Sequence, residues 1–271
     1  DVANGSVFPK DRRLIVQRYL DAPFLEIEGR RKFDLRVYVL LTSLDPLVAY
    51  VHRQGLVRFS AHEYTMKNLR CRYVHLTNYS VNKKSKKYVE ADLLHDDDLY
   101  DDDPTKTAKQ KQKNLKNKWS LEELWSWLET RGYDSARLRR QINELIVKTL
   151  VAAESEMSAQ ARRFFSSVSG KRLVPACARP CYELFGFDIL LDEALRPWLI
   201  EVNVSPSLLG GSALDRQIKA ELMADTFHTV GFEPLDVDVL KRDRRNYQYR
   251  GVVPPRSQDF GGLYYSSAQH R

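Results

Sequence analysis

The chain has 271 residues, of which 43% are apolar, 29% are charged and three are cysteines. This composition is typical of a globular protein in a reducing compartment and excludes a disulfide framework, while no stretch approaches the roughly 18 consecutive apolar residues of a membrane helix. The net charge of +7 favours acidic partners, and we expect a protein partner rather than nucleic acid because the usual RNA- and DNA-binding signatures are absent.

Short strands are predicted within the first 60 residues. The apolar run LIVQRYL, residues 14–20, predicts a buried strand that ends at the turn signal Asp21-Ala22-Pro23. Residues 33–41 begin with period-2 alternation, which is typical of a strand with one face in the core. Residues 47–52 and 56–60 flank Arg53-Gln54-Gly55 and predict a hairpin. The polar face of the 33–41 strand holds Lys32, Asp34 and Arg36.

A charged segment follows these strands. Residues 96–103 contain six aspartates, and residues 106–118 contain six lysines. Blocks of like charge repel one another and cannot pack, so a solvated insertion is predicted over residues 96–118.

Helices and a second pair of strands are predicted after the insertion. Ser120 and Glu123 have the spacing of a capping box, and Gly132 marks the end of the helix that this box would start. A longer amphipathic helix is predicted from near residue 138, followed by strands at 182–191 and 197–204 and by a helix over about residues 214–230. The predicted organisation comprises central strands (1–66), a loop region with the charged insertion (67–118), a C-terminal subdomain with the hairpin (119–231) and a basic extended tail (232–271).

The second pair of strands brings polar side chains together. We place its turn between Ala194 and Leu195. Asp188 then lies opposite Glu201, and Asn203 points to the same face. Opposed carboxylates repel one another unless a positive charge lies between them, and carboxylate and amide oxygens suit Mg²⁺. The alternative is that one carboxylate pairs with an arginine while the other is exposed. The opposite face is predicted to hold Phe187, Ile189, Ile200 and Val202.

Other polar residues suit phosphate chemistry. Arg36 and Arg58 lie on neighbouring predicted strands, and arginine binds phosphate or carboxylate in a bidentate manner. The segment His75-Leu76-Thr77-Asn78 offers a hydroxyl and an amide to a ligand. The alternatives are a surface ion pair for either arginine and a structural hydrogen bond for His75.

Six segments, in chain order, resemble the tubulin tyrosine ligase-like family: VQRYL, KFDLRVYVLLTSLDPLVAY, GLVRFS, HLTNYSVNKK, NKWS and CYELFGFDILLDEALRPWLIEVNVSPSL. The resemblance implies an α+β protein of the ATP-grasp fold, with an antiparallel sheet flanked by helices. The family's phosphate-covering loop and N-terminal lysines have no counterpart here. We therefore expect the central and C-terminal portions of the fold, without its N-terminal part.

The resemblance also implies roles for the residues at matching positions. The adenine-binding hinge would comprise Gln17 and the backbone of Arg18, Tyr19 and Leu20. The magnesium ligands would be Asp188, Glu201 and Asn203. The phosphate and the acceptor carboxylate would be held by Arg36 and Arg58, with Thr77 and Asn78 near the γ-phosphate and Lys32 and Asp34 beside it.

The implied reaction uses ATP and Mg²⁺ to activate a carboxylate as an acyl phosphate, which the amine of an amino acid then attacks. YSVNKK and CYELFGFD are most similar to the polyglutamylase branch of the family. That branch implies transfer of free glutamate to a glutamate side chain in an acidic tubulin tail. We expect a monomer in the cytoplasm, on microtubules of the cytoskeleton, a cilium, an axoneme or a basal body.

Three alternatives stay open at this point. The first is a non-catalytic microtubule- or axoneme-associated structural protein on the same fold, and the second is a family ligase that uses glycine or tyrosine. The third is another ATP-grasp ligase that acts on small molecules. We also expect the basic run at residues 241–245 to contact the microtubule.

Overall fold

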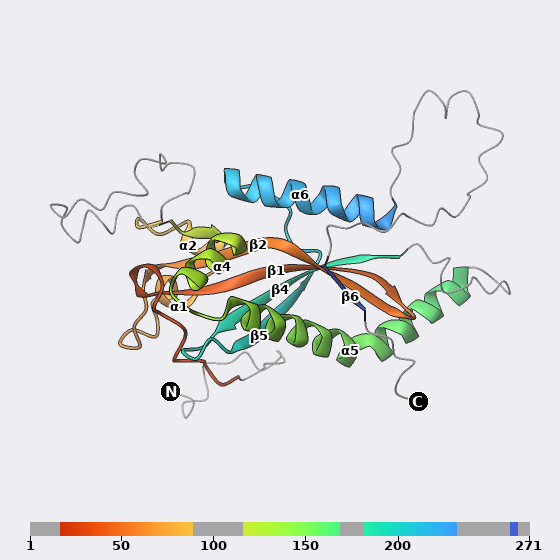
Figure 1. Ribbon diagram of the computed structural model, residues 1–271, viewed down its shortest axis with the longest axis horizontal. Helices are drawn as coiled ribbons and strands as arrows, with labels where there is room; N and C mark the ends of the chain where they lie inside the picture. The colour runs from red at the N-terminus through yellow and green to blue at the C-terminus, as the bar shows by residue number, and fades with distance from the viewer. Residues whose placement is uncertain (1–16, 89–115, 169–180, 232–260, 265–271) are drawn as a thin grey trace, which may run out of the picture.

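The computed structural model describes residues 17–88, 116–168, 181–231 and 261–264, which form an α+β structure around one antiparallel sheet (Figure 1). The strands are β1 (Arg31–Leu44), β2 (Leu47–Glu63), β3 (Lys118–Ser120), β4 (Glu183–Leu191), β5 (Pro197–Val204) and β6 (Gly261–Tyr264). The helices are the 3-10 turn η1 (Glu28–Arg30), α1 (Arg72–His75), α2 (Tyr79–Asn82), α4 (Leu121–Thr130), α5 (Ser135–Val168) and α6 (Ala213–Val230). The strand order is β3-β2-β1-β4-β5, and β6 pairs with β2 off this path.

The sheet separates two cores of unequal size. Phe33, Leu35 and Val37 of β1 pack in the larger core with α4 and α5. The alternate residues of β1 face the other way, where Tyr38 packs against Ile218 and other residues of α6. Figure 1 shows α5 and α6 on opposite sides of the sheet. The predicted alternation of β1 is therefore confirmed, and its polar face is the face that α6 partly covers.

The helix predictions after residue 119 are confirmed, and the caps explain where two helices begin. Ser120 Oγ accepts a hydrogen bond from the backbone of Glu123 at 3.0 Å, while the Glu123 carboxylate accepts one from the backbone of Ser120 at 2.6 Å. Ser212 caps α6 in the same way by accepting from Asp215 N at 3.1 Å. α6 ends at Gly231, whose φ of 73° suits a residue without a side chain.

The predicted hairpin at residues 53–55 is wrong. β2 runs through these residues, and the turn between β1 and β2 lies at Asp45-Pro46 instead. Val37 pairs with Gly55 and Val39 with Val51, so one residue of β1 faces three of β2. The turn-like residues thus form a bulge within a long strand.

Gly55 permits a close approach rather than a turn. A side-chain carbon on this residue would lie 2.4 Å from the carbonyl oxygen of Arg36 and 2.7 Å from Leu121 Cδ1. Glycine is therefore required by packing against β1 and α4.

The predicted buried strand at residues 14–20 is also wrong over its described part. Residues 17–19 are exposed and outside any strand, and residues 14–16 lie outside the described residues. β1 and β5 already occupy the edges of β4. The chain first joins the sheet further on, where Pro23 bridges to Asp192 and Phe24 N donates to the carbonyl of Leu191.

The two segments of unusual charge are described only at their ends. Residues 89–115, which include most of the predicted insertion, lie outside the described residues, but Lys118 begins β3 and is buried. In the predicted tail, residues 261–264 pair with residues 48–51 of β2, and the basic run at residues 241–245 lies outside the described residues. Among the described helices none is both long and apolar enough to span a bilayer.

Candidate active site

Charged residues form a row across the sheet on the face that α6 partly covers. Arg58 of β2 pairs with Lys118 of β3 on one side and with Asp34 of β1 on the other. Two residues further along β1, Arg36 pairs with Asp188 of β4, which pairs in turn with Glu201 of β5. Because directly opposed residues of antiparallel strands share a face, we call this line of six residues the charged row.

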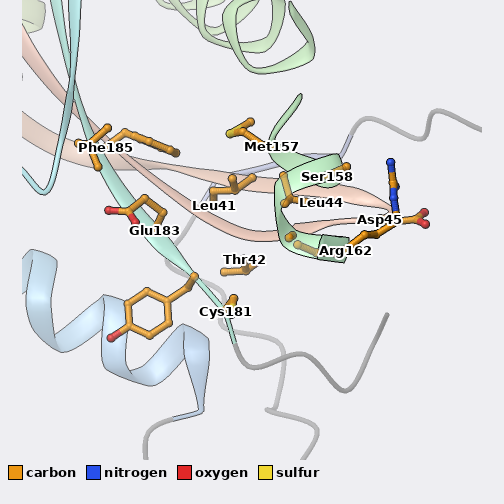
Figure 2. A pocket seen from close by; sticks show the side chains of 14 residues that line it. Leu41, Thr42, Leu44, Asp45, Met157, Ser158, Arg162, Cys181, Glu183 and Phe185 are labelled. Carbon is orange, nitrogen blue, oxygen red and sulfur yellow. The ribbon is translucent and has the colours of Figure 1, made fainter. Parts of the chain in front are cut away.

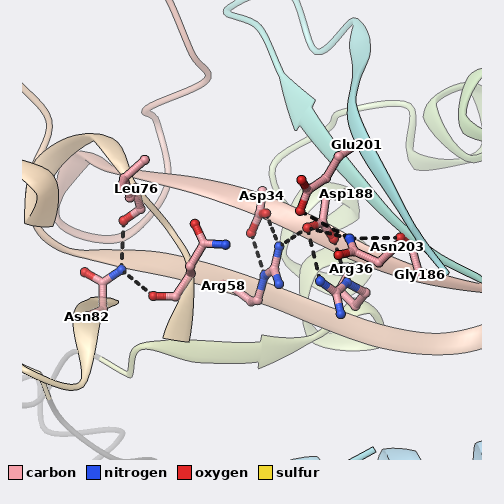
Figure 3. A network of polar contacts seen from close by, with 10 residues as sticks. Asp34, Arg36, Arg58, Leu76, Asn82, Gly186, Asp188, Glu201 and Asn203 are labelled. Atoms are coloured by element: carbon pink, nitrogen blue, oxygen red, sulfur yellow. Dashed lines mark hydrogen bonds and ion pairs between the residues drawn. The ribbon is translucent and has the colours of Figure 1, made fainter. Parts of the chain in front are cut away.

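The centre of the charged row is a network of arginines and buried aspartates (Figure 3). Arg36 Nε donates to Asp188 Oδ1 at 2.5 Å, and its Nη2 donates to Oδ2 at 3.1 Å. Arg58 Nε donates to Asp34 Oδ1 at 2.9 Å, and its Nη2 contacts both Asp34 Oδ2 and, at 2.9 Å, Asp188 Oδ2. Asp34 and Asp188 are each only 2% exposed. Such bidentate, charge-assisted contacts fix the orientation of both guanidinium groups.

The surroundings of Asp188 and Arg58 favour the charged form of each of these two groups. Burial raises the pKa of the Asp188 carboxyl, but the hydrogen bond from Arg36 and the charge of Arg58 outweigh it, so the pKa lies below its ordinary value. Burial lowers the pKa of Arg58, but the charge and hydrogen bonds of Asp34, and then those of Asp188, raise it above its ordinary value. Asp188 and Arg58 are therefore charged at neutral pH.

A β-bulge orients Glu201 toward the network. Ile189 pairs with Leu199, whereas the preceding residue Asp188 pairs with Glu201, so Ile200 is the extra residue. A regular strand would place Ile200 opposite Asp188 and turn Glu201 to the other face, because a shift of one residue reverses every side chain. The predicted pairing of Asp188 with Glu201 is thus confirmed. The predicted position of Ile200 in the apolar face is wrong, since it is 46% exposed.

Asn203 connects the two carboxylates. Its Nδ2 lies 3.3 Å from Asp188 Oδ2, 3.2 Å from Glu201 Oε1 and 3.3 Å from the carbonyl oxygen of Gly186. Gly186 also leaves space for the network, because a side-chain carbon there would lie 2.9 Å from Pro206 Cβ and 3.1 Å from Arg36 Cδ.

The donor set fits a hard cation that keeps other ligands. Asp188, Glu201 and Asn203 supply two carboxylates and one amide, and Mg²⁺ commonly binds one or two carboxylates together with phosphate oxygens. Rotating the Asn203 amide by half a turn would exchange its nitrogen for its oxygen. The described residues show the arginine pairing of Asp188 that the sequence left open, with Glu201 exposed. They contain no cluster of three or more histidine, cysteine, aspartate or glutamate residues that could hold a metal.

A second cluster brings part of the predicted hinge to the charged row. Lys32 Nζ donates to Tyr19 Oη at 3.2 Å, and the hydroxyl of Tyr19 lies 2.8 Å from His75 Nδ1. Burial lowers the pKa of Lys32, and the charge of Asp34 offsets part of that effect. The other ring nitrogen of His75 contacts the carbonyl of Asn68 at 3.0 Å, so the structure gives His75 structural hydrogen bonds. Gln17 and Arg18 are exposed, and Leu20 is half-buried.

The predicted pair Thr77 and Asn78 depends on a residue that the sequence analysis missed. Thr77 is buried, and Asn78 is exposed at the start of α2. Asn82, which is 1% exposed, accepts from Ala61 N at 2.8 Å and donates to the carbonyls of Leu76 and Asn78 at 2.7 and 3.1 Å. It therefore ties the segment that contains Thr77 to the end of β2. The position of Asn82 inside the HLTNYSVNKK motif was the signal in the sequence that could have identified it.

A lysine pair at the other edge of the row was also missed. Lys118 forms a buried ion pair with Asp215 of α6 and lies over the ring of Tyr79, 4.4 Å from its centroid. Lys219 Nζ donates to the carbonyl of Leu209 at 2.5 Å and lies 3.8 Å from Asp215 Oδ1. These contacts join the first turn of α6 to β3. In the sequence, Lys118 ends a lysine-rich run, and such a run is typical of a solvent-exposed segment rather than of a strand.

A cavity of about 400 Å³ lies away from the charged row (Figure 2). It is bounded by the far end of β1, the later turns of α5 and the start of β4, with Leu41, Met157 and Phe185 among its lining residues. None of the predicted site residues lines it.

The family match and the fold give the class of the protein. Its antiparallel α+β sheet carries arginines and carboxylates across one face, and the domain of the matching family is of the ATP-grasp type. Residues 2–238 match the model of the tubulin-tyrosine ligase family, and the chain belongs to this family. The predicted family resemblance is therefore confirmed.

The chain is similar to tubulin glutamylases. It is 38% identical over 233 residues to tubulin polyglutamylase TTLL5 of Homo sapiens, which covers 85% of this chain and 16% of that protein. It is 42% identical over 234 residues to tubulin monoglutamylase TTLL4 of Mus musculus, which covers 84% and 17%. Tubulin polyglutamylase ttll-4 of Caenorhabditis elegans is 34% identical over 252 residues, 90% of this chain and 36% of that protein. The chain thus spans about a sixth of the length of the first two relatives.

Proposed function

We propose that this chain carries part of the active site of an ATP-dependent tubulin glutamate ligase. The observation that carries the proposal is the buried arginine network, in which Arg36 and Arg58 are held rigid beside the carboxylates Asp188 and Glu201. Membership of the tubulin-tyrosine ligase family and similarity to glutamylases support it.

In this reaction the main tasks of the protein are to position the reactants and to neutralise charge. An acceptor carboxylate oxygen attacks the γ-phosphorus, ADP leaves, and the amine of glutamate then displaces phosphate from the acyl phosphate with loss of a proton. No nucleophilic side chain is needed. Such transfers are accelerated by donors that are already oriented toward the developing charge.

Arg58 is built for this positioning role. Asp34 and Asp188 hold it from two sides, and the described residues make no hydrogen bond to its Nη1. Arg58 can therefore donate to a phosphate or carboxylate oxygen without reorienting. Arg36 would act beside it, and Lys32, Tyr19, Thr77 and Asn78 would line the nucleotide side of the row.

Asp188, Glu201 and Asn203 would hold Mg²⁺, which would supply positive charge at the phosphate oxygens. The proposed partner is tubulin, through its acidic tails, which places the protein on microtubules of the cytoskeleton or a cilium. Relatives of both the monoglutamylase and the polyglutamylase kind are similar to this chain. Polyglutamylation, which the motif wording favours, remains our proposal for the finer activity.

The test is to incubate the full-length protein with microtubules, Mg-ATP and radiolabelled glutamate, with Glu201→Gln as the matched variant. We expect incorporation that the variant loses, and mass spectrometry of the tails should show chains of several glutamates. Products with single glutamates would replace polyglutamylation by monoglutamylation. Microtubule binding without incorporation of glutamate, glycine or tyrosine would instead support the non-catalytic alternative.

A further inference from the structure

The segment between β2 and the charged insertion has an unusual charge. Residues 64–88 contain no aspartate or glutamate. They contain seven basic residues, all of them exposed: Lys67, Arg70, Arg72, Lys83, Lys84, Lys86 and Lys87. We call residues 64–88 the basic segment.

These charges have no counter-charge nearby in the described structure. Among the described residues, the ion pairs involve other lysines and arginines, such as Arg30 with Glu63 and Lys116 with Glu123. None of the seven takes part in one. Their positive potential is therefore directed to solvent and is available to an anionic partner.

The basic segment is fixed to the sheet. Asn82 binds the backbone of Ala61 at 2.8 Å, and His62 contacts Ser85 Oγ at 3.1 Å. The ring of His62 also stacks on Tyr73, with 5.6 Å between centroids. Burial lowers the pKa of His62, and the charge of Lys87 adds to this effect. The cations are thus presented on an anchored segment, which lowers the entropy cost of binding.

The basic segment borders one end of the charged row. Thr77 and Asn78 lie between its two groups of basic residues. Tyr79, the next residue, has Lys118 over its ring, and Lys118 pairs with Arg58 in the sheet. Figure 1 shows α1 and α2 beside the same end of β1 and β2. An extended polypeptide that reaches Arg58 can therefore touch the basic segment.

We propose that the basic segment docks the acidic stretch of the acceptor polypeptide next to the residue that is modified. This inference rests on the proposed function and assigns the acceptor to a surface. An acidic polypeptide carries several carboxylates, which can form ion pairs with several of the exposed lysines and arginines. Coulomb attraction between the two opposite charges also raises the encounter rate. Single-stranded nucleic acid fits less well, because it needs free aromatic faces. Here Tyr73 stacks on His62, and Tyr79 is covered by lysines.

The test compares two triple variants with equal charge. Lys84, Lys86 and Lys87 are changed to Glu in the basic segment. The control changes the exposed residues Arg137, Arg140 and Arg163 of α5 to Glu, on the opposite side of the sheet. Each triple lowers the net charge from +7 by 6, to +1. Any effect of net charge on binding or catalysis is therefore the same in both triple variants.

We expect the first triple to raise the KM for the acidic acceptor by about tenfold or more, as loss of three exposed ion pairs predicts. Its kcat and its KM for ATP should stay within about twofold of the parent. The difference should disappear near 1 M salt, where the Debye length is about 3 Å. Equal effects of both triples, or an unchanged KM, would overturn the proposal.

A direct binding assay separates this inference from the proposed function. A fluorescein-labelled glutamate-rich peptide should lose affinity for the first triple only, even if the parent incorporates no glutamate. Tighter binding of polyuridine than of the peptide to the same residues would refute the assignment to an acidic protein. So would peptide binding that responds to the first triple only after residues 96–103, with their six aspartates, are deleted.

Discussion

Removing Asp34 should destabilise the protein far more than removing an exposed carboxylate of the same sheet. The Asp34 side chain is 3% exposed and that of Arg58 is 10% exposed. Arg58 directs two nitrogens at Asp34 and one of them also at Asp188. Breaking a buried ion pair by removing one partner costs about 3–5 kcal/mol, because a buried charge loses its compensation. Since Asp188 remains, we expect a loss of about 3 kcal/mol for Asp34→Ala, at the low end of this range.

The matched control is Glu63→Ala on the neighbouring strand. Glu63 pairs with Arg30 at 3.8 Å, and their side chains are 56% and 70% exposed. An exposed pair contributes about 0–1 kcal/mol. Both variants therefore remove a carboxylate from the same sheet, and they differ in how deeply that carboxylate is buried.

Urea unfolding measures both effects. With a slope of about 1–3 kcal/mol per molar urea, Asp34→Ala should lower the midpoint by about 1–3 M. A double-mutant cycle with Arg58→Met should show a coupling energy of about 2 kcal/mol. If Asp34→Ala costs no more than Glu63→Ala, or if the cycle shows no coupling, the buried network does not stabilise the fold.

Two further predictions concern the same network. Gly186→Ala should cost about 1–3 kcal/mol through overpacking against Arg36 and Pro206, whereas Gly211→Ala should cost little, because its nearest neighbour lies at 3.5 Å; equal urea midpoints would contradict this reasoning. Asp188→Asn should reduce stability at neutral pH. The folded pKa of Asp188 lies below its ordinary value of 3.8, so the ionised carboxylate stabilises the parent protein above that pH and stops doing so as the pH falls below it. The difference in unfolding free energy between the parent and Asp188→Asn should therefore shrink on acidification, and a difference that grows would contradict the prediction.

Regular patterns in the sequence predicted the elements that carry them. α4 begins directly after Ser120, whose side chain accepts a hydrogen bond from the backbone of Glu123, as the capping-box spacing predicted. The two strands of the hairpin also follow from local pattern. Such elements are predictable because the information lies within a few residues of the chain.

Register and charge partners depended on the whole fold. The turn of the hairpin was predicted between Ala194 and Leu195, but the pairing of Leu191 with Pro197 centres it on Ala194. Asp188 still pairs with Glu201 because the bulge at Ile200 shifts the register by one residue. Gly55 signalled a turn but serves a close approach to Arg36. Lys118 belonged to a lysine-rich pattern, and only its contact with Asp215 explains its burial. Sequence spacing cannot show these neighbours, because they come from segments far apart in the chain.

The charge balance of the charged row supports placing the proposed Mg²⁺ and the proposed acidic polypeptide at opposite ends of it. Each cation of the charged row already has a buried anion: Arg58 has Asp34, Arg36 has Asp188 and Lys118 has Asp215. These pairs limit the cost of burying charge, and they leave little surplus positive charge for a polyphosphate. At the β5 end, exposed Glu201 adds a negative charge, so a bound cation is what would make that end accept phosphate oxygens. At the β3 end, the exposed lysines beyond Tyr79 supply unpaired positive charge of their own, which suits a polymer of carboxylates and requires no metal.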